Sequence, residues 1–316
     1  LFLGFSSWLM LPIRANAKVV INENNPEDAR ALLAYYNREQ YPGVDSPVYG
    51  TYYSDMFAAA GEDQDGKPKY EKDYTLGKYI IVNKYKNAVQ GPNPEHQGLL
   101  PRMWSSQNAE NYMRYFGALD FRITQPNQEL RQAAEQIKIG FANGEIGADQ
   151  YISFLKRFDE YIEVQPPTVW DNVKYMVEFQ FNYMYLRYFM WNFVGKQNDV
   201  QGRYNDNGNW LSGINFLDSW RLGSQDNLPS DIQNNPGRNT YFFLPLLLGI
   251  IGIVFQVSKD KKQFWVLLIF FLFTGLAIQF YTNPGIFQPR ERDYSLVGSF
   301  YIFALWIGLG VYGLYD

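Results

Sequence analysis

Three apolar stretches close the chain and constrain its fold more than any other feature. They cover residues 241–257, 264–281 and 296–315, with no charged residue inside any of them and short polar loops between them. About 20 apolar residues in a helix cross a hydrocarbon core of about 30 Å. Aromatic residues at their ends are typical of helix ends at a membrane surface. The sequence therefore predicts three transmembrane helices over 241–316, rather than buried helices of a large soluble domain.

The loop between the first two stretches predicts their orientation. It holds Lys259, Lys261 and Lys262, and loops rich in lysine stay on the cytoplasmic side. Residues before 241 and the 282–295 loop then lie outside the cytoplasm. Residues 1–13 are also apolar, and we interpret them as the end of a further transmembrane helix. The chain is then a fragment of a polytopic protein, although a short true amino terminus is the alternative.

Composition excludes several functions for the region before residue 241. It holds 23 Lys and Arg against 28 Asp and Glu, and nucleic-acid binding needs a basic surface. The whole chain has no Cys and one His, which rules out thiolate metal sites and argues against a His-rich metal centre or a His-based triad. No metal site is predicted.

The outer region divides into a mixed α+β part over 14–125 and a helical part over 126–240. Asn24 or Asn25 is expected to cap a helix that ends at 41–43. Tyrosines and β-branched residues indicate strands at 48–53, 78–89 and 99–104.

Three further expectations concern loops and helices of this outer region. Residues 62–66 resemble a calcium loop, but the ligand spacing fails, and we expect a solvated hairpin turn. His96 is expected at the surface. Residues 126–161 read as two helices broken at 143–144.

An aromatic helix is predicted from Trp170 to Phe193. At 100° per residue, Asp171, Lys174, Glu178 and Asn182 form a polar stripe, and the opposite side is wide and aromatic. The helix lies either in the membrane interface or in the core of the outer domain. Arg187 falls on the apolar side, where a charge is costly unless it reaches lipid headgroups or an anion.

Two further segments are candidates for binding. Residues 196–239 form a long Asn- and Gly-rich loop with Trp210 and Trp220, which serves either as a sugar-stacking surface or as an ordered cap. In the 282–295 loop, Arg290 and Arg292 are spaced to hold a phosphate, with Glu291 and Asp293 setting their orientation. Salt bridges within this group of four explain the motif equally well.

Several of these motifs together resemble one family. They include residues 21–27, 37–41, 101–103, 187–193, 197–199, 208–210 and 289–301. The sequence resembles the protein O-mannosyltransferase-like family, of the GT-C glycosyltransferase type, which is abundant in Bacteroidetes. The resemblance spans nearly the whole chain. It implies a multi-pass protein of the bacterial inner membrane with a large periplasmic domain, which agrees with a polytopic α-helical fold carrying a mixed α+β outer domain.

The resemblance also implies a function. Such enzymes transfer a sugar, here mannose, from a polyprenyl-phosphate donor to Ser or Thr of an exported protein. The chain's partners are then membrane lipid, the lipid-linked donor and an acceptor protein; the donor is a substrate, and no cofactor is implied. Donor-phosphate contacts are expected from Arg290, Arg292 and Arg187, supported by Glu291, Asp293, Tyr294, Asn192, Asn198 and Asp199. The catalytic acid of this enzyme class lies upstream of residue 1, so a noncatalytic membrane-anchored module that binds protein or glycan is the alternative.

Overall fold

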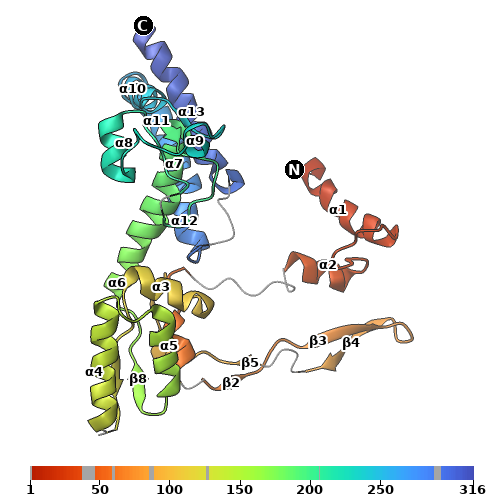
Figure 1. Ribbon diagram of the computed structural model, residues 1–316. Helices are drawn as coiled ribbons and strands as arrows, with labels where there is room; N and C mark the ends of the chain where they lie inside the picture. The colour runs from red at the N-terminus through yellow and green to blue at the C-terminus, as the bar shows by residue number, and fades with distance from the viewer. Residues whose placement is uncertain are drawn as a thin grey trace. The chain divides into compact units, whose positions relative to one another are not determined.

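The structure, a computed structural model, is a mixed α/β protein (Figure 1). It describes residues 2–37, 47–58, 61–84, 89–125, 128–205, 207–287 and 293–316. The chain divides into two units, Leu1–Ser46 and Pro47–Asp316, which we describe separately.

The first unit contains two helices, α1 (Phe2–Asn16) and α2 (Ala29–Tyr36). The ring of Trp8 lies 4.5 Å from that of Tyr36, centroid to centroid. The predicted cap of α2 was wrong. Asp28 caps the helix, because its backbone is extended and its carboxylate accepts a hydrogen bond from the amide of Ala31 at 2.8 Å. The helix ends at Tyr36 with Asn37 as its C-cap, earlier than the predicted end at 41–43, and residues 41–43 themselves lie outside the described residues.

The strands of the second unit form five antiparallel pairs and no larger sheet among the described residues. The pairs are β1 (Tyr49–Thr51) with β6 (Gln97–Leu99), β2 (Asp63–Gln64) with β5 (Val89–Gln90), β3 (Lys69–Asp73) with β4 (Lys78–Asn83), β7 (Phe121–Ile123) with β8 (Ile162–Val164), and β9 (Gly195–Lys196) with β10 (Asn239–Thr240). Three 3₁₀ turns connect them: η1 (Tyr53–Phe57), η2 (Pro94–His96) and η3 (Ser106–Asn108).

Three expectations for this region need correction. The strand predicted at 48–53 covers only 49–51, because the chain then turns into η1. The strand predicted at 99–104 ends at residue 99, where β6 ends. Residues 63–64 pair with β5 instead of forming a hairpin turn. His96 is buried, because its Nδ1 lies 2.9 Å from the hydroxyl of Ser54 in the interior.

Aromatic packing holds the part of this unit around α3, α4 and α5 together. Helices α3 (Ala109–Phe116), α4 (Gln128–Ala142) and α5 (Ala148–Arg157) surround one buried cluster. Tyr112 and Tyr151 are both fully buried in this cluster, although they belong to the two parts predicted before and after residue 125. The break between α4 and α5 confirms the two helices predicted over 126–161.

One long helical segment runs through residues 169–193. It comprises α6 (Val169–Tyr175), the π-helix η4 (Met176–Leu186) and α7 (Arg187–Phe193). A reciprocal capping box starts it, in which the amide of Asp171 donates to Thr168 Oγ1 at 3.2 Å and the amide of Thr168 donates to Asp171 Oδ2 at 2.8 Å. Of the predicted polar stripe, Lys174, Glu178 and Asn182 are exposed, while Arg187 is buried.

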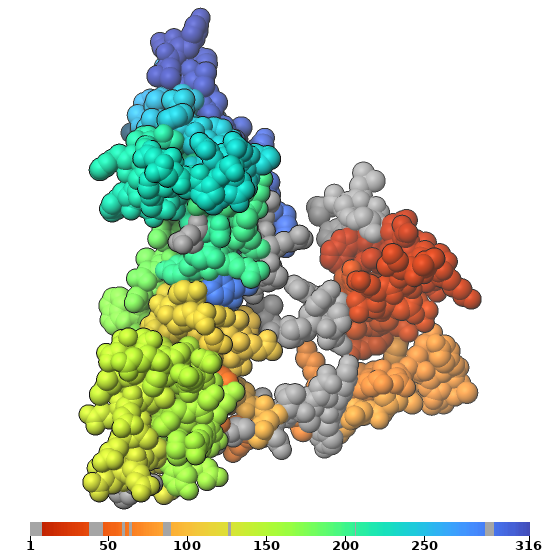
Figure 2. Space-filling model, viewed as in Figure 1, coloured from red at the N-terminus to blue at the C-terminus, as the bar shows by residue number. Residues whose placement is uncertain are grey.

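The predicted loop over 196–239 contains two short helices that the sequence analysis missed. They are α8 (Asn215–Leu222) and α9 (Ser230–Gln233). In Figure 1, α8 and α9 lie near α7, away from α6, and Figure 2 shows the same teal region on the surface.

All three terminal apolar stretches are helical. They form α10 (Leu244–Lys259), α11 (Lys261–Thr274) followed by α12 (Leu276–Thr282), and α13 (Asp293–Tyr315). Two of the helical segments, 261–282 and 294–315, are long and apolar enough to cross a membrane, whereas α10 is apolar but shorter. It starts three residues later than predicted, since Phe242 and Phe243 adopt positive φ in a turn.

Helices α10 and α13 pack closely in parallel. A Cβ on Gly249 would lie 2.3 Å from the Phe303 ring, and one on Gly252 would lie 1.8 Å from the carbonyl oxygen of Trp306. Further along, Lys259 Nζ lies 2.6 Å from the carboxylate of Asp316. Small residues thus let these helices approach as they do in membrane proteins.

Candidate functional site

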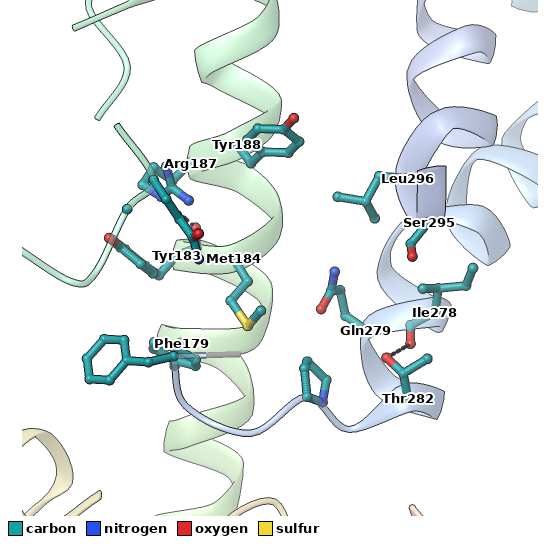
Figure 3. Close-up of a pocket in the computed structure, with 14 residues that line it drawn as sticks. Phe179, Tyr183, Met184, Arg187, Tyr188, Ile278, Gln279, Thr282, Ser295 and Leu296 are labelled. Atoms are coloured by element: carbon teal, nitrogen blue, oxygen red, sulfur yellow. Dashed lines mark hydrogen bonds between the residues drawn. The ribbon is translucent and has the colours of Figure 1, made fainter. Parts of the chain in front are cut away.

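A pocket of about 90 Å³ lies between the long helical segment, the C-terminal end of α12 and the N-terminal end of α13 (Figure 3). Met184 points into it from one wall, with Gln279 and Leu296 opposite. Its lining is Phe179, Tyr183, Met184, Arg187, Tyr188, Gln201, Gly202, Ile278, Gln279, Thr282, Pro284, Phe287, Ser295 and Leu296. Among the described residues that line it, Arg187 alone carries a charge. The pocket therefore combines apolar walls with a positive charge.

The pocket lies at a defined end of the apolar helices. Gly249 of α10 lies beside Phe303 of α13. Residues 295–296 are about two helical turns before Phe303, toward the N-terminal ends of both helices. The lysine-bearing turn at 259–262 follows the opposite end of α10. The pocket and this lysine turn are thus at opposite ends of the helix pair.

Arg187 is 6% exposed and is held against the long helix. Its Nε donates to the carbonyl oxygen of Tyr183 at 3.1 Å, and its guanidinium carbon lies 4.6 Å from the centre of the Tyr183 ring. Its Nη1 donates to the carbonyl oxygen of Gly208. Arg187 therefore fastens the loop after β9 onto the helix, in addition to lining the pocket.

Two glycines let that loop come so close. A Cβ on Gly202 would lie 2.6 Å from the Tyr183 hydroxyl and 2.8 Å from the Arg187 guanidinium carbon. Gly208 has φ +70°, where a side chain is strained, and a Cβ there would lie 2.5 Å from the Val200 carbonyl oxygen. The amide of Tyr204 also donates to the Tyr183 hydroxyl, at 2.5 Å.

A second buried polar group joins the segment after β6 to α12. The Arg102 side chain is fully buried, and its Nη1 donates to the carbonyl oxygen of Phe280 at 2.8 Å. Its guanidinium carbon lies 4.3 Å from the centre of the Phe280 ring. Burial lowers the pKa of Arg102 to about 10. Asn283 extends the link, since its Nδ2 donates to the carbonyl oxygen of Pro101 at 2.8 Å.

The predicted site residues separate in the structure. Arg187 lines the pocket, whereas Asn192 lines a second hollow with Trp191 and Lys196. Asn198 is buried and holds the loop, because its Oδ1 accepts from the amides of Val200 and Gly208 at 3.2 and 3.1 Å.

The other predicted residues do not line the pocket or cannot be judged. Asp199 lies 3.8 Å from Lys196 Nζ and is largely exposed, and Tyr294 is exposed at the start of α13. Residues 290–292 lie outside the described residues, as does the side chain of Asp293. Phe287 and Ser295, on the two sides of that segment, both line the pocket.

Sequence reasoning placed Arg102 in a family motif without assigning it a role, and it did not single out Gln279. The Arg102 guanidinium donates to two main-chain carbonyl oxygens and to Asn283 Oδ1, and local sequence does not predict such distant contacts. Gln279 did carry a signal, because a polar side chain inside an apolar span is often functional. Within the described ranges, no group of three or more His, Cys, Asp or Glu is arranged to hold a metal ion.

Part of the chain matches a known family model. Residues 43–177 match the model of a family described as a family of unknown function (DUF8416). The match covers less than half of the 316 residues and ends just after α6. No curated protein and no solved structure matched the chain.

Proposed function

We propose that this chain is part of a membrane glycosyltransferase that takes its sugar from a polyprenyl-phosphate donor. One observation carries the proposal: the pocket has apolar walls and Arg187, and lies at the end of the apolar helices away from the lysine turn. A lipid-linked sugar phosphate has the same two parts, an apolar chain and an anionic group. Guanidinium groups bind phosphate oxygens well.

The proposed setting is the bacterial inner membrane, crossed by α10, by α11 with α12, and by α13. Helices α10 and α13 run parallel, as two spans separated by one intervening span must. Alpha10 is about 24 Å long, which is short for a span of about 30 Å. The lysine turn then faces the cytoplasm, and the pocket and the outer domain face the periplasm.

The proposed chemistry is sugar transfer to an exported protein. A Ser or Thr hydroxyl attacks the anomeric carbon, the bond from that carbon to the phosphate oxygen breaks, and the hydroxyl proton passes to a base. The polyprenyl phosphate leaves with negative charge, which fixed cations stabilise. We assign this role to Arg292 and Arg290. Arg187 supplies the positive charge of the pocket wall. Arg292 is three residues before the pocket residue Ser295 in sequence.

The second candidate is a noncatalytic module that holds lipid or glycan. It is favoured by one observation: no carboxylate is among the described residues that line the pocket. The enzyme requires a base for the hydroxyl, whereas the module does not.

Photo-crosslinking tests the donor site in the full-length protein. A benzophenone amino acid replaces Met184, which lines the pocket, or Leu186, which is two residues away, exposed and absent from the lining. With a polyprenyl-phosphate mannose carrying an alkyne tag, we expect labelling at 184 that excess untagged donor removes, and little at 186. Equal labelling at the two positions, or none at 184, would refute the donor site.

A further inference from the structure

The side of α8 that faces away from the protein is apolar and aromatic. Phe216 is 86% exposed and Trp220 is 79% exposed. They are four residues apart, so their side chains lie on the same side of the helix, one turn apart. Ile214, just before the helix, is also exposed. Single exposed apolar residues are normal, but two large aromatic rings on one turn indicate a contact surface.

The charged side chains of α8 are turned inward. Asp218 is buried and accepts hydrogen bonds from the amides of Ser212 and Gly213 at 2.9 and 2.8 Å. The Arg221 guanidinium carbon lies 3.4 Å from the centre of the Trp210 ring. The exposed side of the helix is therefore uncharged.

The helix is also fixed to the start of α10. The amide of Phe242 donates to the carbonyl oxygen of Ser212 at 3.0 Å, and the Phe242 ring lies against Gly213. The ring of Trp210 lies 5.9 Å from that of Phe243. Since α10 begins at Leu244, α8 is held beside the end of an apolar helix whose Leu244 and Leu247 are exposed.

We propose that α8 is an interfacial helix whose Phe216 and Trp220 enter the headgroup region of the outer phospholipid leaflet. The inference rests on the proposed crossing of the membrane by α10. Aromatic rings favour the boundary between headgroups and acyl chains, and α8 continues the apolar surface of α10 at that level. A glycan would need polar groups beside the rings, and the Asn215 amide is already bound to Asp226 at 2.6 Å and Ser219 at 2.8 Å.

Such an anchor has a consequence for the donor pocket. The loop that Arg187 fastens is joined to α8 through Trp210 and Ser212. An α8 bound to the leaflet therefore sets the depth at which that loop meets the lipid.

Lipid-nitroxide quenching tests the anchor in the full-length protein in phosphatidylcholine nanodiscs. This chain has no Cys, so Phe216→Cys, Trp170→Cys and Leu247→Cys each give one labelling site in it for a bimane fluorophore. Trp170 is a matched control, because it is 78% exposed and begins the long helix. Trp170 and Phe193 are at opposite ends of the long helical segment, and α8 lies near the Phe193 end.

We expect a lipid with the nitroxide near the headgroup to quench bimane at 216 at least twofold more than at 170. A nitroxide deep in the acyl chain should quench bimane at 247. Quenching at 247 without quenching at 216 would overturn the anchor and leave the crossing by α10 intact. If neither is quenched, the crossing fails and the anchor with it. Protection of 216 from aqueous iodide by added mannotriose, without lipid quenching, would overturn the anchor in favour of a glycan surface.

Discussion

An alanine at Gly252 should separate α10 from α13. The added Cβ would lie 1.8 Å from the Trp306 carbonyl oxygen and 2.8 Å from the Gly310 nitrogen, both backbone atoms that no rotamer change can move. Ordinary contacts begin near 3.4 Å, so the helices must part by more than 1 Å at this point. A gap of about 0.5–1 Å already removes a quarter to a half of each van der Waals attraction.

We expect Gly252→Ala to lower the free energy of unfolding by about 3 kcal/mol, the upper end of what overpacking costs. Gly308→Ala is the matched control on α13, since a Cβ there meets nothing within 4 Å. It should be neutral or slightly stabilising because alanine favours a helix over glycine.

The assay is unfolding of the purified full-length protein in mixed detergent–SDS micelles, followed by tryptophan fluorescence. Trp306 is buried beside this contact, and its Nε1 donates to Gln256 Oε1 at 2.7 Å, so it reports on the separation. Gly310→Ala should behave like Gly252→Ala, because its Cβ would lie 1.9 Å from the Leu248 carbonyl oxygen. Equal midpoints for the 252 and 308 variants would refute the close packing.

Three further predictions concern other parts of the chain. In the full-length protein, Arg292→Ala should abolish glycan transfer at unchanged expression; unchanged glycosylation of a periplasmic acceptor, measured by mass spectrometry, would remove its phosphate role. Burial lowers the pKa of His96, so its contribution to stability is fully present above about pH 6.5 and is lost as pH falls toward the folded pKa. His96→Gln should flatten the fall in thermal midpoint between pH 7.5 and 5.5, and an unaltered slope would argue against this. A cysteine replacing Lys261 should resist an impermeant thiol reagent in intact cells while one replacing Asn205 reacts; the reverse pattern would invert the topology.

Periodicity and composition predicted the parts of the fold in which one element decides its own state. The helices α4 and α5 follow from amphipathic spacing and the break at 143–144, and α10, α11, α12 and α13 follow from uninterrupted apolar sequence. The prediction that Arg187 lies on the apolar side of its helix was correct for the same reason, since its direction depends only on spacing along one helix.

Elements that depend on distant partners could not be read from the sequence. His96 is buried because Ser54 is positioned beside it, and no local pattern indicates that contact. Helix α8 was missed because it depends on the Asp218 carboxylate, which organises the turn at 212–213, in a segment whose composition is typical of loops. Arg102 acts through the end of α12, 178 residues away in the chain.

We propose that the pocket beside Arg187 serves sugar transfer from a lipid phosphate. The most direct test is transfer by the full-length protein in nanodiscs, with polyprenyl-phosphate mannose as donor and a Ser- and Thr-containing peptide as acceptor. Mass spectrometry of the peptide is the readout, and Gly308→Ala serves as the folded control. We expect addition of one hexose to Ser or Thr that requires the donor and is lost in Arg292→Ala. No transfer by folded protein that still crosslinks the donor at position 184 would contradict the enzyme and favour the noncatalytic module.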